Sequence, residues 1–263
     1  MKPIRSAFTK DHALFIPFIM AGHPHPEITI QAVLALEEAG ADLIEIGVPF
    51  SDPIADGPIN QKAGEIGLQY GVTLMKCLDM VKEVKALGCQ VPIILFSYLN
   101  PIMAMGFQKF AKLAKEAGVD GIIAVDLPPE EGSEFFQIMN QYEIEPILLS
   151  SPTTDPHRLK LFADIEPGFI YVISRCGVTG TQQDVRDELE HNIATLRQSF
   201  PFIPLSVGFG ISNEAQAAKV AKFADGVIVG SYLVKALAEY GIAHFKMLAK
   251  RLADAIHGCE MPS

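Results

Sequence analysis

The sequence predicts an α/β barrel of eight strand-helix repeats, and three observations support this fold class. Short runs rich in β-branched residues recur along the chain, they are apolar at consecutive positions, and longer segments separate them. Runs that are apolar throughout suit strands covered on both faces, as in parallel sheets with helical crossovers. Eight such pairs in roughly 250 residues match a (β/α)8 TIM barrel. The expected strands are 14–20, 43–48, 91–96, 121–125, 146–150, 169–174, 203–207 and 226–230.

Helices are expected between these runs. The segments PEITIQAVLALEEAG and GFQKFAKLAKEAG carry apolar residues at steps of three and four, with charges between them. EAGADLIEI, EAGVDGIIAV and KFADGVIVG form a weak internal echo, because each ends a helix, turns on small residues and an aspartate, and enters a strand. Pro17 and Pro92 weaken the first and third predicted strands, since proline cannot donate to a ladder. A doubly wound open sheet is the alternative architecture.

We expect residues 1–263 to form a single barrel domain with short helical additions at its N-terminal and C-terminal ends. Hydrophobic residues make up 49% of the chain, which is enough to bury a large core. The net charge of -10 comes without a Lys/Arg cluster, which argues against a nucleic-acid partner. We expect no signal peptide and no membrane partner, since no apolar run is long enough to span a bilayer, and hence a cytoplasmic location.

Cysteine and histidine positions predict neither disulfides nor a metal centre. His23 and His25 follow the first predicted strand, but a proline separates them and no third ligand is evident. Cys176 has no histidine nearby in sequence, which disfavours a nucleophilic role. The cysteines form no CxxC pair and no zinc-like spacing with histidine, so reduced thiols are the simplest account, and they are Cys77, Cys89, Cys176 and Cys259.

The stretch IEIGVPFSDPIADGP places one glutamate inside an apolar strand and two aspartates in the loop that follows. In a barrel, the carboxyl ends of the strands and the loops after them form the active site. Glu45 lies near the end of the second predicted strand, where an apolar interior would raise its pKa toward the range useful for proton transfer. We interpret Glu45 as a candidate acid/base. The alternative is a strand glutamate that points outward to a helix lysine.

Two glycine-bearing segments late in the chain indicate a phosphate site. SVGFGIS follows the seventh predicted strand and VGSYLVK the eighth, and barrel enzymes often bind phosphate at these loops through backbone N–H groups and a helix N-terminus. Alternatively, Gly208 and Gly210 only form a tight turn and Ser231 only caps a helix. SRCGVTGTQQD, after the sixth predicted strand, suits a loop that closes over a ligand or a plain surface loop.

These motifs together give the chain a resemblance to the tryptophan synthase alpha subunit family. The match runs in order through nearly the whole chain, in IEIGVPFSDPIADGP, SYLNPI, VDLPPEE, SPTT, SRCGVTG, GFGIS and VGSYLVK. The resemblance implies a (β/α)8 barrel that is a retro-aldol lyase. Such an enzyme cleaves indole-3-glycerol phosphate to indole and glyceraldehyde 3-phosphate.

The resemblance also implies roles for individual residues. Glu45 is expected to transfer protons at ring carbon C3 and at the adjacent hydroxyl, and Asp56 to stabilise the positive charge that develops on the indole ring. Asp52 is a weaker candidate, because its SDP turn can use it structurally, and Arg175 is expected only to anchor its loop. The implied substrate-binding residues are the indole-pocket residues Phe18, Tyr98 and Tyr171, the loop residue Thr179, and the phosphate donors Gly180, Gly210, Gly230 and Ser231.

The resemblance further implies a partner, a beta subunit that binds pyridoxal phosphate and joins indole to serine within an alpha2beta2 heterotetramer. No cofactor and no metal is expected in this chain. The sequence departs from the family pattern at Met20, His23, Ile59 and Asn60. These departures concern the loop that faces the partner and leave the expected catalytic groups in place. Two other interpretations stay open: a different phosphate-binding barrel enzyme, and a non-catalytic subunit that keeps the pocket to bind a phosphate ligand.

Overall fold

The computed structural model describes residues 3–151, 156–173, 182–208 and 210–259, and it confirms the predicted barrel. Its strands are β1 (Leu14–Met20), β2 (Ile44–Gly47), β3 (Ile93–Ser97), β4 (Gly121–Ala124), β5 (Glu145–Pro146), β6 (Leu148–Ser150), β7 (Ile170–Ile173), β8 (Leu205–Gly208) and β9 (Gly226–Val229). They form one parallel sheet in the order β5-β4-β3-β2-β1-β9-β8-β7-β6. Only Ile147 separates β5 from β6, so this stretch pairs with β4 on one side and β7 on the other and closes the sheet.

The strands agree with the predicted runs, with small differences that have physical causes. The fifth predicted strand is divided, because β5 pairs only with β4 and β6 only with β7. Pro92 precedes β3 and contributes only its carbonyl, which accepts a hydrogen bond from the N–H of Ile44 at 3.0 Å. Pro17 lies inside β1 where the pairing with β9 ends, and the pairing with β2 begins at the next residue, Phe18.

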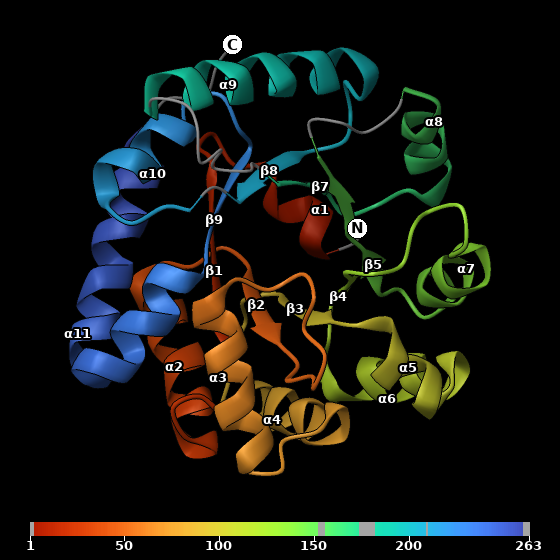
Figure 1. Cartoon of the computed structure of the whole chain (residues 1–263), viewed down its shortest axis with the longest axis vertical. Helices are drawn as coiled ribbons and strands as arrows, with labels where there is room; N and C mark the ends of the chain where they lie inside the picture. The colour runs from red at the N-terminus through yellow and green to blue at the C-terminus, as the bar shows by residue number, and fades with distance from the viewer. Residues whose placement is uncertain (1–2, 152–155, 174–181, 209, 260–263) are drawn as a thin grey trace.

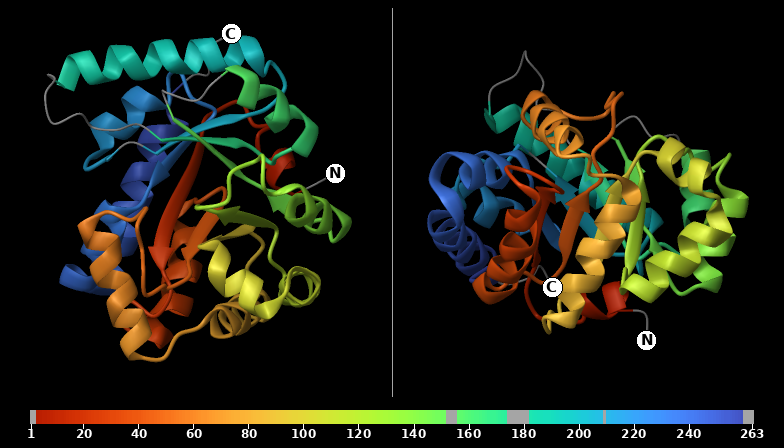
Figure 2. Two further views of the ribbon diagram at one scale, coloured as in Figure 1. Left: turned by 45° about the vertical axis from the view of Figure 1, so that its right-hand side comes forward. Right: turned by 90° about the horizontal axis from the view of Figure 1, so that it is seen from below.

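Helices surround the sheet, as Figures 1 and 2 show. They are α1 (Pro3–Ala7), α2 (Pro26–Ala39), α3 (Pro58–Gln69), α4 (Leu74–Ala86), α5 (Leu99–Met105), α6 (Phe107–Ala117), α7 (Ser133–Gln141), α8 (Pro156–Ile165), α9 (Gln182–Ser199), α10 (Glu214–Val220) and α11 (Ser231–His257). Strand β2 is followed by two helices, and so is β3, where a plain strand-helix repeat would have one. None of the helices in the described part of the chain combines the length and the apolar character needed to cross a bilayer.

Strand residues alternate between an outer layer and the barrel interior. Ile44 and Ile46 of β2 belong to the outer core cluster, which includes helix residues. Ile94, the β3 neighbour of Glu45, belongs to a second cluster that fills the barrel interior together with Leu14. Because successive side chains of a strand point to opposite faces, Glu45 points into the interior with Ile94.

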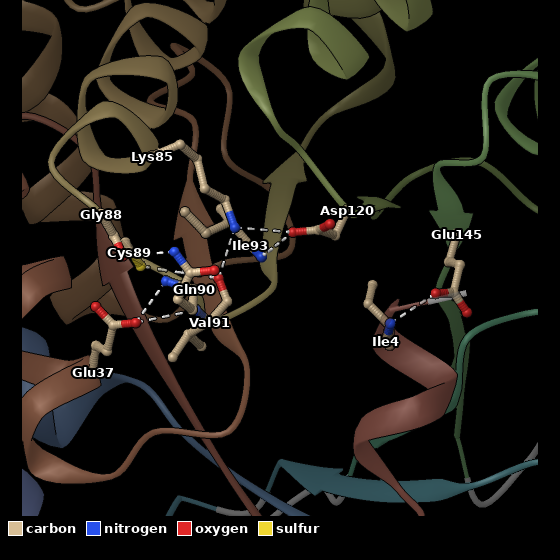
Figure 3. Close-up of polar contacts among 10 residues, drawn as sticks. All are labelled: Ile4, Glu37, Lys85, Gly88, Cys89, Gln90, Val91, Ile93, Asp120 and Glu145. Atoms are coloured by element: carbon tan, nitrogen blue, oxygen red, sulfur yellow. Dashed lines mark hydrogen bonds and ion pairs between the residues drawn. The ribbon is translucent and has the colours of Figure 1, made fainter. Parts of the chain in front are cut away.

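Three aspartates in the predicted helix-to-strand turns hold neighbouring strands in register. In each case one residue at or near the start of a strand exchanges two hydrogen bonds with an aspartate before the next strand: its N–H donates to the carboxylate, and its carbonyl accepts from the aspartate N–H. The N–H to carboxylate distances are 2.8 Å for Phe15 and Asp42, 2.9 Å for Ile93 and Asp120, and 2.7 Å for Leu205 and Asp225. A cation accompanies each carboxylate: Lys10, Lys85 and Arg197 respectively (Figure 3 for Lys85).

Helix α1 is fixed at the same end of the barrel by a buried glutamate. The N–H of Ile4 donates to one carboxylate oxygen of Glu145 at 2.8 Å (Figure 3), and the N–H of Arg5 donates to the other at 3.3 Å. The side chain of Ile4 belongs to the interior cluster. These contacts use a carboxylate to satisfy N–H groups of the first helical turn, which have no partner within the helix. Helix α1 therefore covers the amino-terminal end of the barrel.

Helix α11 is broken at Gly241, whose backbone is not helical and has a positive φ (φ 72°, ψ 179°). The part before the break follows β9, and the part after it ends at His257. In Figure 1 α11 and α2 lie side by side, and they are in contact. An added Cβ at Gly241 would meet no atom within 4 Å, so the backbone conformation alone requires glycine there.

The strand-linking role of the aspartates predicts that Asp120→Ala lowers the free energy of unfolding by about 1–3 kcal/mol, because it leaves the N–H of Ile93 without its acceptor. Urea denaturation measures the loss. Glu116→Ala is the matched control, since Glu116 forms only a 4.0 Å exposed pair with Lys112 and should change stability by less than about 0.5 kcal/mol. Equal losses in the two variants would contradict the register role.

Candidate active site

Glu45 is a buried acid in the barrel interior. It pairs in register with Phe18 of β1 and Ile94 of β3, and its exposure is 0%. Within the described residues, no group donates a hydrogen bond to either of its carboxylate oxygens. Burial raises the pKa of Glu45 to about 8, so the carboxyl is largely protonated at neutral pH. The predicted rise in the pKa of Glu45 is therefore confirmed. The alternative, in which the Glu45 side chain points outward to a helix lysine, is wrong.

A cavity of about 750 Å³ opens at the carboxyl ends of the strands. Five of the residues expected to bind substrate line it: Phe18, Tyr171, Gly210, Gly230 and Ser231. Phe96 of β3 lies edge-on to Phe18, with ring centroids 5.4 Å apart. Aromatic walls of this kind suit a flat apolar ring. Burial raises the pKa of Tyr171, and the carboxyl groups of Glu45 and Asp56 raise it further when they are ionised.

Two strand-end glycines give the aromatic walls their space. A methyl group on Gly47 would lie 2.6 Å from the Phe18 ring, and one on Gly208 would lie 2.3 Å from the Tyr171 hydroxyl. Distances below 3.0 Å force a shift of the ring or of the strand. Gly208 ends β8 and does not merely form a turn, so the structure assigns it a packing reason that the sequence alone left open.

Asp56 is held in the loop after β2 by Tyr98. The Tyr98 hydroxyl donates to Oδ2 of Asp56 and accepts from the N–H of Ala55, both at 2.9 Å. Burial raises the pKa of Asp56, and the bond from Tyr98 opposes that rise. Tyr98 itself is buried and stacks on Phe50 with ring centroids 4.9 Å apart. Tyr98, Asp56 and Glu45 are not among the residues that line this cavity, although Glu45 lies in register with the lining residue Phe18.

The amino terminus of α11 faces the cavity. Gly230 is the N-cap residue and has no side chain to satisfy the first N–H groups of the helix, and Ser231 opens the first turn. The Ser231 hydroxyl donates to the amide oxygen of Asn60 in α3 at 3.3 Å. Lys235, one turn further along α11, also lines the cavity and brings a cationic side chain to this wall. A helix N-terminus with free N–H groups is a ready anion site.

The other candidates from the sequence lie elsewhere. Thr179, Gly180, Arg175 and Cys176 lie outside the described residues. Asp52 is exposed and accepts from the hydroxyl of Ser51, in keeping with a turn role. His23 is buried, and burial lowers its pKa, whereas His25 caps α2 by accepting from the N–H of Glu27 at 3.4 Å.

Sequence reasoning missed three contributors to the site. Phe96 ends a run that was read only as a strand, although it shares its interior face with Glu45 through Ile94. Lys235 follows Ser231 at helical spacing, a signal that the phosphate motif already contained. Phe50 had no signal, because its stacking on Tyr98 joins two different loops.

A closed parallel barrel defines the (β/α)8 class, and a buried acid without a hydrogen-bond donor among the described residues, in register with the aromatic cavity wall at Phe18, is typical of an enzyme of that class. The family model described as "Tryptophan synthase alpha chain" matches residues 4–259. A protein of that name from Methylococcus capsulatus is 46% identical over 85% of this chain and 83% of its own. The crystal structure of tryptophan synthase subunit alpha from Legionella pneumophila matches with a TM-score of 0.91 and 34% identity, over 98% of this chain and 99% of that one. A tryptophan synthase from M. tuberculosis in an aminoacrylate-bound form matches with a TM-score of 0.88 and 31% identity, over 97% and 100%.

The chain belongs to the tryptophan synthase alpha chain family. It is therefore the lyase subunit of tryptophan biosynthesis, whose reaction is cleavage of indole-3-glycerol phosphate to indole and glyceraldehyde 3-phosphate. The predicted barrel and the predicted enzyme class are both confirmed.

The space needed by Tyr171 predicts that Gly208→Ala weakens binding of an unreactive indole alkyl phosphate at least about fivefold, since overpacking costs about 1–3 kcal/mol. Isothermal titration calorimetry measures the affinity. The control is Gly57→Ala, because Gly57 lines the same cavity but an added Cβ there meets no atom within 4 Å. Equal affinities in the two variants would refute the packing argument.

Proposed function

We propose that Glu45 performs the proton transfers in the cleavage of indole-3-glycerol phosphate. The bond between indole C3 and the glycerol chain breaks when C3 gains a proton and the hydroxyl on the adjacent side-chain carbon loses one, which leaves indole and an aldehyde. A single carboxyl with a pKa near neutrality is suited to both transfers. The observation that carries the proposal is the burial of Glu45 without a hydrogen-bond donor among the described residues, and this burial raises its pKa to about 8.

Asp56 is proposed to stabilise the indole ring as it becomes positively charged. A carboxylate near the ring N–H lowers the energy of that charge most effectively where water is excluded. Its hydrogen bond with Tyr98 supports this role, because a positioned carboxylate needs no reorganisation during the reaction. Phe18, Phe96 and Tyr171 are proposed to hold the ring between them.

The phosphate group is proposed to bind at the amino terminus of α11. The N–H groups of Gly230 and Ser231 and the backbone of Gly210 supply donors, and the helix dipole favours an anion. Lys235 adds a cationic side chain at the same wall, where it also pairs with Glu239 at 3.8 Å. Thr179 and Gly180, from the loop after β7, complete the proposed set.

A beta subunit is the proposed partner, in an alpha2beta2 heterotetramer that carries pyridoxal phosphate on the beta subunit and operates in the cytoplasm. The family assignment and the matching tryptophan synthase structures support a beta partner. A closed passage between the two subunits suits indole, because indole is uncharged and would otherwise diffuse away. The lyase rate should change as purified beta subunit is added. A rate that stayed constant over the full titration would refute functional coupling between the two subunits.

The acid/base role predicts that Glu45→Gln lowers the release of glyceraldehyde 3-phosphate about 10²–10⁴-fold, alone and with beta subunit, because glutamine cannot exchange a proton. A coupled dehydrogenase assay measures the release. Glu65→Gln, at an exposed glutamate of α3, is the matched control and should keep the wild-type rate. Full activity in the Glu45 variant would remove Glu45 from the mechanism, and no release by the folded wild type in any mixture would overturn the proposed function.

The raised pKa of Glu45 also predicts how stability depends on pH. The folded chain holds this proton up to about pH 8, whereas the unfolded chain releases it near 4.5, so its stabilising contribution is full below pH 4.5 and is lost as the pH rises to 8. Glu45→Gln should therefore match the wild type in acid and become more stable than it as the pH rises, by up to roughly 5 kcal/mol. Denaturation curves between pH 4.5 and 8.5 measure the difference, and a constant difference would contradict the shift.

A further inference from the structure

Two histidines and an aspartate meet at the barrel face opposite the cavity. His12 precedes β1, Asp42 precedes β2, and His257 ends α11, so three separate parts of the chain contribute. One possible ligand atom from each side chain lies within 4.8 Å of the other two. The two imidazole rings have centroids 4.2 Å apart. This group of residues, here called the His-Asp-His cluster, plays no part in the lyase reaction.

Hydrogen bonds hold the carboxylate of Asp42 in a fixed position within the cluster. Its Oδ2 accepts hydrogen bonds from the N–H of Phe15 and from Nε2 of His257, both at 2.8 Å, and its Oδ1 accepts from Lys10. Burial raises the pKa of Asp42, but the bonds from His257, Lys10 and Phe15 together hold it below its ordinary value. The Asp42 side chain is only 3% exposed, so these hydrogen bonds hold the carboxylate in one orientation.

The His12 ring is oriented as metal-binding histidines usually are. Nδ1 of His12 lies 3.0 Å from the carbonyl oxygen of Ala13, which favours the tautomer with the proton on Nδ1 and the lone pair on Nε2. Metal-binding histidines commonly donate their second ring N–H to a backbone carbonyl in this way, which fixes the ring and the tautomer. The N–H of Phe15 supports the carboxylate similarly.

We propose that the His-Asp-His cluster binds a divalent transition metal ion of the zinc class, with His12, Asp42 and His257 as ligands and water in the fourth position. Two imidazoles and one carboxylate suit Zn²⁺, whereas Mg²⁺ and Ca²⁺ prefer oxygen ligands. Lys10 supplies the charge that the metal would replace. Its side chain is 46% exposed, so its ammonium group can move into solvent when a metal takes Oδ1.

A metal at this position would join the segment before β1, the turn before β2 and the last turn of α11. Because it binds the folded chain and not the unfolded one, it stabilises the fold in proportion to its affinity and concentration. The spacing along the sequence could not have revealed the site, since His257 lies 215 positions after Asp42.

The test is titration of the chelator-treated full chain with ZnCl₂ by isothermal titration calorimetry, together with its melting temperature. The wild type should bind one zinc ion per chain and melt at a higher temperature with zinc, but not with MgCl₂. His12→Asn and His257→Asn should each weaken the zinc affinity at least about tenfold. His244→Asn is the matched control, because His244 is an exposed residue of α11 whose ring lies tilted against Tyr240 and outside the cluster.

Lys10→Met gives a readout that a purely structural role would not move. Removing the ammonium group frees Oδ1 of Asp42 and removes a like charge, so zinc should bind more tightly to this variant. Circular dichroism of each variant shows that it is folded. The proposal is overturned if the folded wild type binds no zinc, if the His12 and His257 variants bind it as the wild type does, or if Lys10→Met leaves the affinity unchanged or lower.

Discussion

The exchange of hydrogen bonds between an aspartate and the start of the neighbouring strand is the interaction on which the barrel depends. A parallel strand that slips by one residue turns every interior side chain outward. Asp42 fixes β2 against β1, and the register that results brings Glu45 level with Phe18. The stability face therefore determines the composition of the catalytic face, although the two lie at opposite ends of the strands.

The barrel treats its two buried glutamates in opposite ways. Glu145 accepts two backbone N–H groups from α1, whereas neither oxygen of Glu45 has a donor within the described residues. A buried acid without a partner costs free energy, and it keeps its proton to avoid a larger cost. The fold tolerates the free-energy cost of burying Glu45 because the other residues of the interior are closely packed and stabilise it. The destabilised position lies in register with Phe18, which lines the substrate cavity.

Much of the fold and part of the site followed from the sequence. Consecutive apolar residues identified each strand, and the aspartate turns identified the stability face, because both patterns are local. The sequence did not predict that two helices occupy the connection after β2 (α3 and α4) and the connection after β3 (α5 and α6). A helical period does not reveal how many helices fill a connection. The bond from Tyr98 to Asp56 and the His-Asp-His cluster depend on which distant segments meet, which no spacing encodes. Glu45 was recognisable because an acid within an apolar strand is a local contradiction.

The break at Gly241 gives one helix two mechanical duties. A continuous α-helix is a stiff rod, so a rotation imposed at one end would be carried to the other. The extended residue interrupts the hydrogen-bond ladder between the segment that carries Ser231 and the segment that ends at His257. Adjustments around a ligand at the amino terminus of α11 can therefore be absorbed at the joint. The carboxyl-terminal segment is anchored on α2, where Lys246 pairs with Glu38.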